Sequence, residues 1–205
     1  MKRKIFIIIF TASAIGINYL CSYLAGLIAF PLYLDSIMTI AVSALCGFIP
    51  GIICAVASNF LLYLFAHTGI LFTICHVSTA VVAHLVFSAE RKRCVRNANT
   101  LRENSGNAMP ADFSYPTDSF MWIGFIAAIT NSVLGDTISY FFYSANTTIP
   151  QVDNAVQGIY VVTKNLSFAA YFGGTVTNLI DKVFSATVSL FVYRAGSHFQ
   201  RVFFV

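Results

Sequence analysis

Long apolar stretches separated by short polar segments run through almost the whole chain. Such stretches are typical of membrane helices, because about 20 apolar residues are needed to cross the hydrocarbon core of a bilayer. Turn signals at Phe30-Pro31, Pro50-Gly51 and residues 67–69 divide the first half of the chain. The pattern predicts six helices, at about 4–29, 35–49, 52–66, 70–88, 119–145 and 167–193.

Composition supports the membrane class. The chain of 205 residues is 58% hydrophobic and 10% charged, whereas a soluble domain carries about 25% charged residues. We therefore expect an all-α, polytopic membrane protein, with residues 1–205 forming a single six-helix transmembrane domain.

The positive charges predict a topology. Lys and Arg residues cluster at residues 2–4, in a polar loop at 89–118 and near the C-terminus. Basic residues favour the cytoplasmic side of membrane helices. Six helices with both termini in the cytoplasm place ten of the 12 Lys and Arg residues there, the exceptions being Lys164 and Lys182. The prediction is a multi-pass protein of the inner (cytoplasmic) membrane.

Several function classes are not expected. The positive-inside pattern explains the net charge of +4 without a nucleic-acid partner. The five cysteines show no CxxC spacing, so neither a disulfide framework nor a zinc site is predicted. Phosphate-binding loops, nucleophile elbows and HExxH motifs are also missing from the sequence. We expect no enzyme, no cofactor and no bound metal, so uphill transport would need a gradient or a partner ATPase.

Four charged residues fall within or beside apolar stretches: Asp35, Asp136, Asp181 and Lys182. A charge at bilayer depth costs about 2.5–3.5 kcal/mol on insertion scales, so each needs a partner or a watery cavity. Asp35 is either a helix N-cap or a ligand contact. Adjacent helix residues point about 100° apart, so we expect Lys182 to pair across helices with Asp136 rather than with Asp181. A substrate or proton site is the alternative.

Uncharged polar residues also occur in or near these helices, including Asn131, Asn165, Asn178, His76 and His84. Such side chains often hydrogen-bond neighbouring helices, and ligand binding is the alternative role. Small residues recur at four-residue spacing, which lets helices approach closely. We expect internal packing for most of them, and contact with another membrane protein is most plausible for the first helix.

Two segments resemble a known family. FPLYLDSIMTIAVSALCGFIPGIICAVASNFL (residues 30–61) carries Pro31, Asp35 and Thr39 before a turn with two glycines, and then Asn59. It resembles the substrate-binding S components of energy-coupling-factor transporters. FGGTVTNLIDKVFSATVSLFVYR (residues 172–194) is similar to the last helix of one uncharacterised branch of that family. Together the two segments cover about a quarter of the chain.

The resemblance implies a six-helix protein that binds a vitamin or related micronutrient near its outer surface. It also implies a transmembrane coupling subunit and two cytoplasmic ATPases as partners, within membrane lipid. Small residues of the first helix would meet the coupling subunit, here Ala12 and Gly16, with Ala14 beside them. The ligand-binding candidates implied by the family's pockets are Asp35, Asn131, Asp136, Lys164, Asn165 and Asn178.

Two other functions fit the same sequence. A membrane sensor or scaffold module would need no coupling subunit. A gradient-driven transporter for small solutes would use Asp136, Asp181 and Lys182 as a relay within the membrane. Six helices without a visible internal repeat favour the micronutrient-binding subunit over the gradient-driven transporter.

Overall fold

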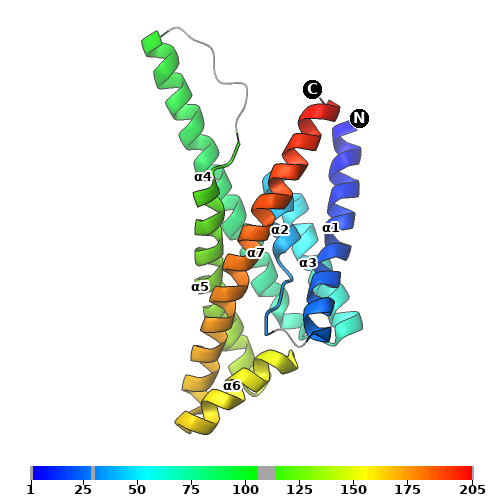
Figure 1. The fold of residues 1–205 in the computed structure, drawn as a ribbon, viewed down its shortest axis with the longest axis vertical. Helices are drawn as coiled ribbons and strands as arrows, with labels where there is room; N and C mark the ends of the chain where they lie inside the picture. The colour runs from blue at the N-terminus through cyan, green and yellow to red at the C-terminus, as the bar shows by residue number, and fades with distance from the viewer. Residues whose placement is uncertain (1, 29–30, 106–113, 205) are drawn as a thin grey trace.

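The computed structural model describes residues 2–28, 31–105 and 114–204, without the side chains of residues 2, 98–105 and 201–204. The regular secondary structure in these ranges is helical, as predicted (Figure 1). Its elements are α1 (Lys2–Leu27), α2 (Ile37–Leu45), α3 (Phe48–Ala66), the 3-10 turn η1 (Ile70–Phe72), α4 (Thr73–Ser105), α5 (Thr117–Phe142), α6 (Pro150–Thr163) and α7 (Leu166–Phe204).

Five helices in the described ranges are long and apolar enough to cross a membrane: α1, α3, α4, α5 and α7. The chain is thus a multi-pass membrane protein. The predicted second span is different, because α2 has only nine residues. At a rise of 1.5 Å per residue it is about 14 Å long, half of what a crossing needs. Six transmembrane helices were predicted, the second and third of them short; the described residues hold five candidate spans, with α2 as a half-length helix.

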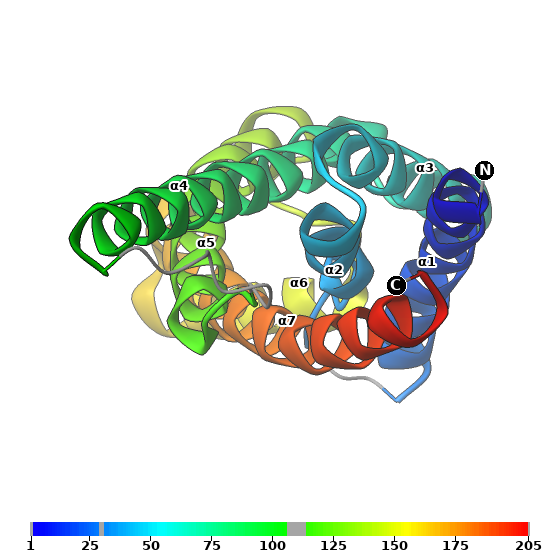
Figure 2. The same ribbon diagram turned by 90° about the horizontal axis from the view of Figure 1, so that it is seen from above.

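The short helix α2 forms the centre of the bundle, with α1, α3, α4 and α7 around it (Figure 2). Every residue of α2 from Ile37 to Ala44 is buried. One side of α2 packs with α4, α5 and α7 around Phe120 and Leu190. Its other side packs with α1 and α3 around Ala14. A helix that is apolar all round is expected to be buried in this way.

The turn between α2 and α3 lies earlier than predicted, at Gly47 rather than at Pro50-Gly51. Gly47 has φ +97° and ψ −172°, a conformation that is open essentially to glycine alone. Pro50 is the third residue of α3. Proline is tolerated in the first turn of a helix, where its missing N–H has no intrahelical partner to lose.

Two further differences concern the polar segments. The predicted loop 89–118 is helical up to Ser105, because α4 continues through its basic residues, and residues 106–113 lie outside the described part. The predicted polar connection 146–166 contains α6. This helix lies across one end of the bundle, which we call the α6 end (Figure 1).

The two termini lie close to each other at the opposite end of the bundle, and α4 extends past the same end on its other side (Figure 1). Most of the basic residues belong to these three segments, so we call this the basic end. The predicted topology requires these basic residues to lie at one end of the bundle, since the positive-inside rule gathers them on one side of the membrane. The two ends of the bundle therefore differ strongly in charge.

Candidate functional site

An extended segment, residues 31–36, leads from the α6 end into the interior and there begins α2. Its backbone is held by α7, because Asp181 Oδ1 accepts the N–H groups of Tyr33 at 3.0 Å and Leu34 at 2.8 Å. Leu34 has a positive φ of 50°. Non-helical backbone at membrane depth is tolerated only where protein or a cavity satisfies its polar groups. Asp181 is fully buried and serves this purpose.

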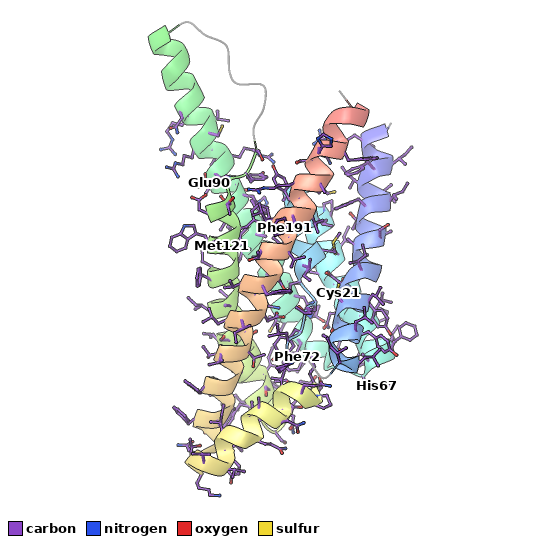
Figure 3. All side chains as sticks on the ribbon, in the orientation of Figure 1. Cys21, His67, Phe72, Glu90, Met121 and Phe191 are labelled. Carbon is purple, nitrogen blue, oxygen red and sulfur yellow. The ribbon has the colours of Figure 1, made fainter. Side chains whose placement is uncertain are left out.

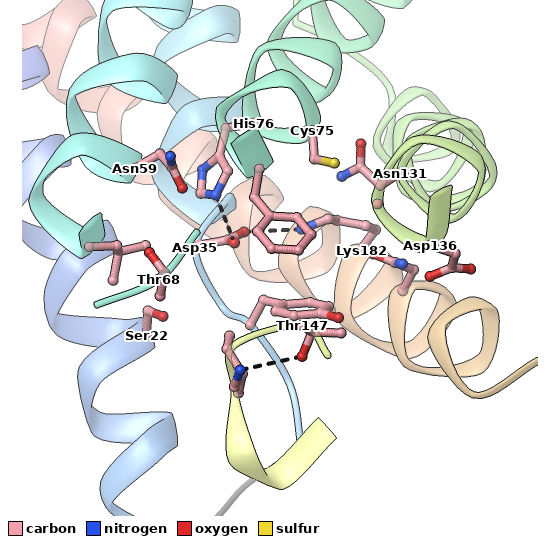
Figure 4. Close-up of a pocket in the computed structure, with 16 residues that line it drawn as sticks. Ser22, Asp35, Asn59, Thr68, Cys75, His76, Asn131, Asp136, Thr147 and Lys182 are labelled. Atoms are coloured by element: carbon pink, nitrogen blue, oxygen red, sulfur yellow. Dashed lines mark hydrogen bonds and ion pairs between the residues drawn. The ribbon is translucent and has the colours of Figure 1, made fainter. Parts of the chain in front are cut away.

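Asp35, at the end of this segment, is the centre of a buried charged network (Figure 4). Its carboxylate lies between two cations or potential cations, with Lys182 Nζ 3.0 Å from Oδ1 and His76 Nε2 3.1 Å from Oδ2. Ser36 donates to Asp35 Oδ1 at 2.6 Å and accepts from Lys182 Nζ at 2.9 Å. The helix N-cap position belongs to Ser36, so the predicted N-cap role of Asp35 is wrong.

The predicted pairing of Lys182 is also wrong. Lys182 contacts Asp35 and its own neighbour Asp181, whose Oδ2 lies 2.7 Å from Nζ. The backbone positions of Asp181 and Lys182 do point to different sides of α7, but a lysine stem of four methylenes is long enough to bring Nζ back. Asp136 is left outside this network.

Asp136 lies on α5, is 3% exposed and contacts α7. Its hydrogen-bond partner is Thr175 Oγ1, 3.4 Å from Oδ2. The carboxylate lies directly on Gly174, where an added Cβ would collide with Oδ1. Gly174 thus allows α5 and α7 to approach with a carboxylate between them, which is the packing role that small residues have in membrane helices.

Two asparagines, Asn131 and Asn59, both connect helices and line a cavity. Asn131 donates to Thr79 Oγ1 at 3.0 Å and accepts from Ser78. Asn59 donates to Thr73 Oγ1 at 2.5 Å. These bonds tie α5 and α3 to α4, as expected of polar side chains between membrane helices. Both asparagines also line a cavity, together with Asn178.

This cavity has a volume of about 50 Å³ and is surrounded by residues of α1, α3, α4, α5 and α7 and of the connections at the α6 end. Its lining includes the acids Asp35 and Asp136 and the bases Lys182 and His76 (Figure 4). Phe72 also lines it and lies toward the α6 end, whereas Glu90 lies toward the basic end (Figure 3). The candidate site is therefore a small polar cavity in the half of the bundle away from the basic residues.

A second cavity of about 190 Å³ lies beside the first, between α1 and residues 148–151. The two share Ser22, Thr68 and Ile149 as lining residues. Asp153 holds the connection that lines both cavities, because Asp153 Oδ1 accepts the backbone N–H of Thr147 at 2.6 Å and the Thr147 hydroxyl at 2.8 Å. We call the first the inner cavity and the second the vestibule.

Four of the six predicted ligand-binding residues line the inner cavity: Asp35, Asn131, Asp136 and Asn178. Lys164 and Asn165 do not join them, because both are exposed at the junction of α6 and α7. Asn165 Oδ1 accepts the N–H of Phe168 at 3.0 Å and so caps the start of α7. The structure therefore gives Asn165 a capping role.

The three small residues of α1 divide between two faces. Ala12 and Gly16 are exposed, and no other atom lies within 4 Å of a Cβ built on Gly16. Ala14 is fully buried in the core against α2 and α3, so in this structure it lies away from the exposed face that carries Ala12 and Gly16.

Sequence reasoning underestimated His76, which it treated mainly as a contact between helices. His76 is 6% exposed, contacts Asp35 and has a buried Nδ1 without a hydrogen-bond partner among the described residues. Its position as an ionisable residue in an apolar span was the available signal. Asp35 lies 41 residues earlier, and no periodicity relates the two.

Neither models of protein families, nor curated protein sequences, nor solved structures match this chain.

Proposed function

We propose that the protein is the substrate-binding subunit of a micronutrient importer in the cytoplasmic membrane. The observation that supports this most is the inner cavity, a buried polar site in the half of the bundle away from the basic residues. With the basic end in the cytoplasm, the cavity faces the outer side, where a nutrient arrives. Binding sites are commonly such concave pockets with a few converging polar groups.

The peripheral position of α1 supports a partner in the membrane. Residues buried within the protein make up 17% of the α1 span, against 33–44% in the other four spans. The exposed pair Ala12 and Gly16 leaves a shallow face on which another helix could approach closely. The partners implied by the family resemblance are a transmembrane coupling subunit and two ATPases.

Co-purification from the native membrane tests this proposal. The tagged chain should recover a coupling subunit with paired ATPases, and Gly16→Leu should lose them while remaining folded, because its side chain has free space in the isolated chain. Gly158→Leu is the matched control, since Gly158 is also exposed and has no atom within 4 Å. Recovery of the chain alone, under conditions that preserve a known transporter complex, would refute the proposal.

A gradient-driven transporter is the second candidate, because His76, Asp35, Lys182 and Asp181 form a continuous chain of ionisable groups within the bundle. Such chains occur in proton relays. The protein reconstituted alone in vesicles should then move protons with solute when a pH gradient is imposed, and Asp181→Asn should abolish this. Proton movement that is unchanged by Asp181→Asn would exclude the relay.

A further inference from the structure

Asp136 is the one carboxylate of the inner cavity that has no cationic partner among the described residues. It is 3% exposed, and its hydrogen bond comes from a hydroxyl, at the long distance of 3.4 Å. The two cationic or potentially cationic groups of the cavity, Lys182 and His76, are both bound to Asp35. The free carboxylate oxygen of Asp136 is thus a buried acceptor beside a cavity.

The acidic side chains around the inner cavity outnumber the basic ones. Asp35, Asp136 and Asp181 would together carry three negative charges when ionised, and Lys182 supplies one positive charge. Even with His76 protonated, the fully ionised cluster would keep one negative charge, and Asp136 is the carboxylate without a cation beside it. An uncompensated charge in a low-dielectric interior is costly. A cation bound in the cavity would remove this cost, whereas an anion would increase it.

We propose that the inner cavity binds the ammonium group of a small organic cation, with Asp136 as its counter-ion. This inference rests on the proposal that the cavity is the solute-binding site. Asn178 is a further polar lining residue of this cavity, and Phe72 contributes an aromatic ring. Organic cations are favoured by aromatic faces as well as by carboxylates.

The chemistry of the lining favours an ammonium group over a metal ion. The described residues contain no group of three His, Cys, Asp or Glu side chains placed to hold a metal. Asp35 Oδ1 and Oδ2 are already occupied by Lys182 and His76. An ammonium group needs only a few acceptors within hydrogen-bond distance, and the carboxylate of Asp136 and the amide of Asn178 are such acceptors among the lining residues.

The two cavities together define the shape of the ligand. The inner cavity of about 50 Å³ is far smaller than the 300–1,000 Å³ that encloses a drug-sized molecule. The vestibule of about 190 Å³ lies next to it and shares three of its lining residues. The described residues that line the vestibule carry no charge. The ligand is therefore a molecule with a cationic head in the inner cavity and a compact, uncharged body in the vestibule.

Three probes of similar shape and different charge test this assignment: benzylammonium, benzyl alcohol and benzoate. Binding to the purified chain in nanodiscs would be measured by calorimetry and by thermal shift. We expect benzylammonium to bind about tenfold or more tightly than either of the others, since charge-assisted hydrogen bonds exceed neutral ones. Asp136→Asn should remove this preference. Asp118→Asn should keep it, because Asp118 is an exposed residue near the other end of α5.

Equal binding of the three probes, no benzylammonium binding, or a preference that survives Asp136→Asn would overturn the inference. The comparison of probes uses the wild-type chain, so it is decisive even where the variant fails to fold. The result is separable from the proposed function. Benzylammonium binding by a chain that recovers no coupling subunit would refute the importer and leave the cation site standing.

Discussion

Lys182→Met removes the cation that two buried carboxylates share. Lys182 is 2% exposed, and its Nζ lies 3.0 Å from Asp35 and 2.7 Å from Asp181. Removing one partner of a buried ion pair costs about 3–5 kcal/mol, because the other charge stays buried without compensation. We expect the free energy of unfolding to fall by about this amount, since methionine keeps the length of the stem and loses only the charge.

The assay is unfolding of the purified protein in mixed micelles by increasing SDS, followed by circular dichroism. Lys164→Met is the control, because Lys164 is exposed and should change stability by less than about 0.5 kcal/mol. The double variant Asp181→Asn/Lys182→Met should be more stable than Lys182→Met alone, since it leaves one buried charge fewer. A loss below about 1 kcal/mol for Lys182→Met, or a double variant that is less stable, would show that the network is not an ion-pair cluster.

Three other substitutions test contacts elsewhere in the bundle. Gly16→Ala is their common control, because a methyl group on Gly16 meets no neighbouring atom. Gly174→Ala should cost about 1–3 kcal/mol in the same unfolding assay and weaken benzylammonium binding, because the new methyl group displaces the carboxylate of Asp136. Gly47→Ala should cost about 1–3 kcal/mol, since φ is +97° there, and a change as small as that of the control would contradict the strained turn. Asn18→Leu should cost about 1–3 kcal/mol, because its carbonyl accepts an N–H from the first turn of α2 at 2.9 Å; unchanged stability would mean that water replaces this bond.

The long apolar spans could be predicted because hydropathy over about 20 residues depends on local sequence alone. The half length of α2 could not be predicted in this way. The predicted helix 35–49 is shortened to Ile37–Leu45, and the segment before it enters the interior because Asp181, far along the chain, accepts the N–H groups of Tyr33 and Leu34. Window averages contain no information on such a contact.

The end of α4 was mispredicted for a different reason. Polarity after Ser88 was interpreted as a loop, but Ala89, Glu90 and the basic residues that follow are good helix formers, and no Pro or Gly interrupts them before Gly106. A loss of hydrophobicity marks where a helix leaves the membrane, and a helix can continue well beyond that point.

The sequence allowed most of the residues of the candidate site to be predicted, but not which of them bind one another. Asp35, Asn131, Asp136 and Asn178 stood out as polar residues near or within apolar spans, and all four line one cavity. The partners of Lys182 did not follow, because helical spacing describes where Cβ points and not where a long side chain ends.

The extended segment and α2 also constrain how the protein is made. The backbone N–H groups of this region bind side chains from α1 and α7: Asn18 accepts from Met38, and Asp181 accepts from Tyr33 and Leu34. Ribosomes deliver α7 after the other described helices, so the N–H groups of Tyr33 and Leu34 lack their Asp181 partner until α7 has been made. A nascent chain that stops before α7 presents these groups to hydrocarbon, at several kcal/mol each. Membrane quality-control proteases thus have a means to distinguish chains that lack α7 from chains that contain it.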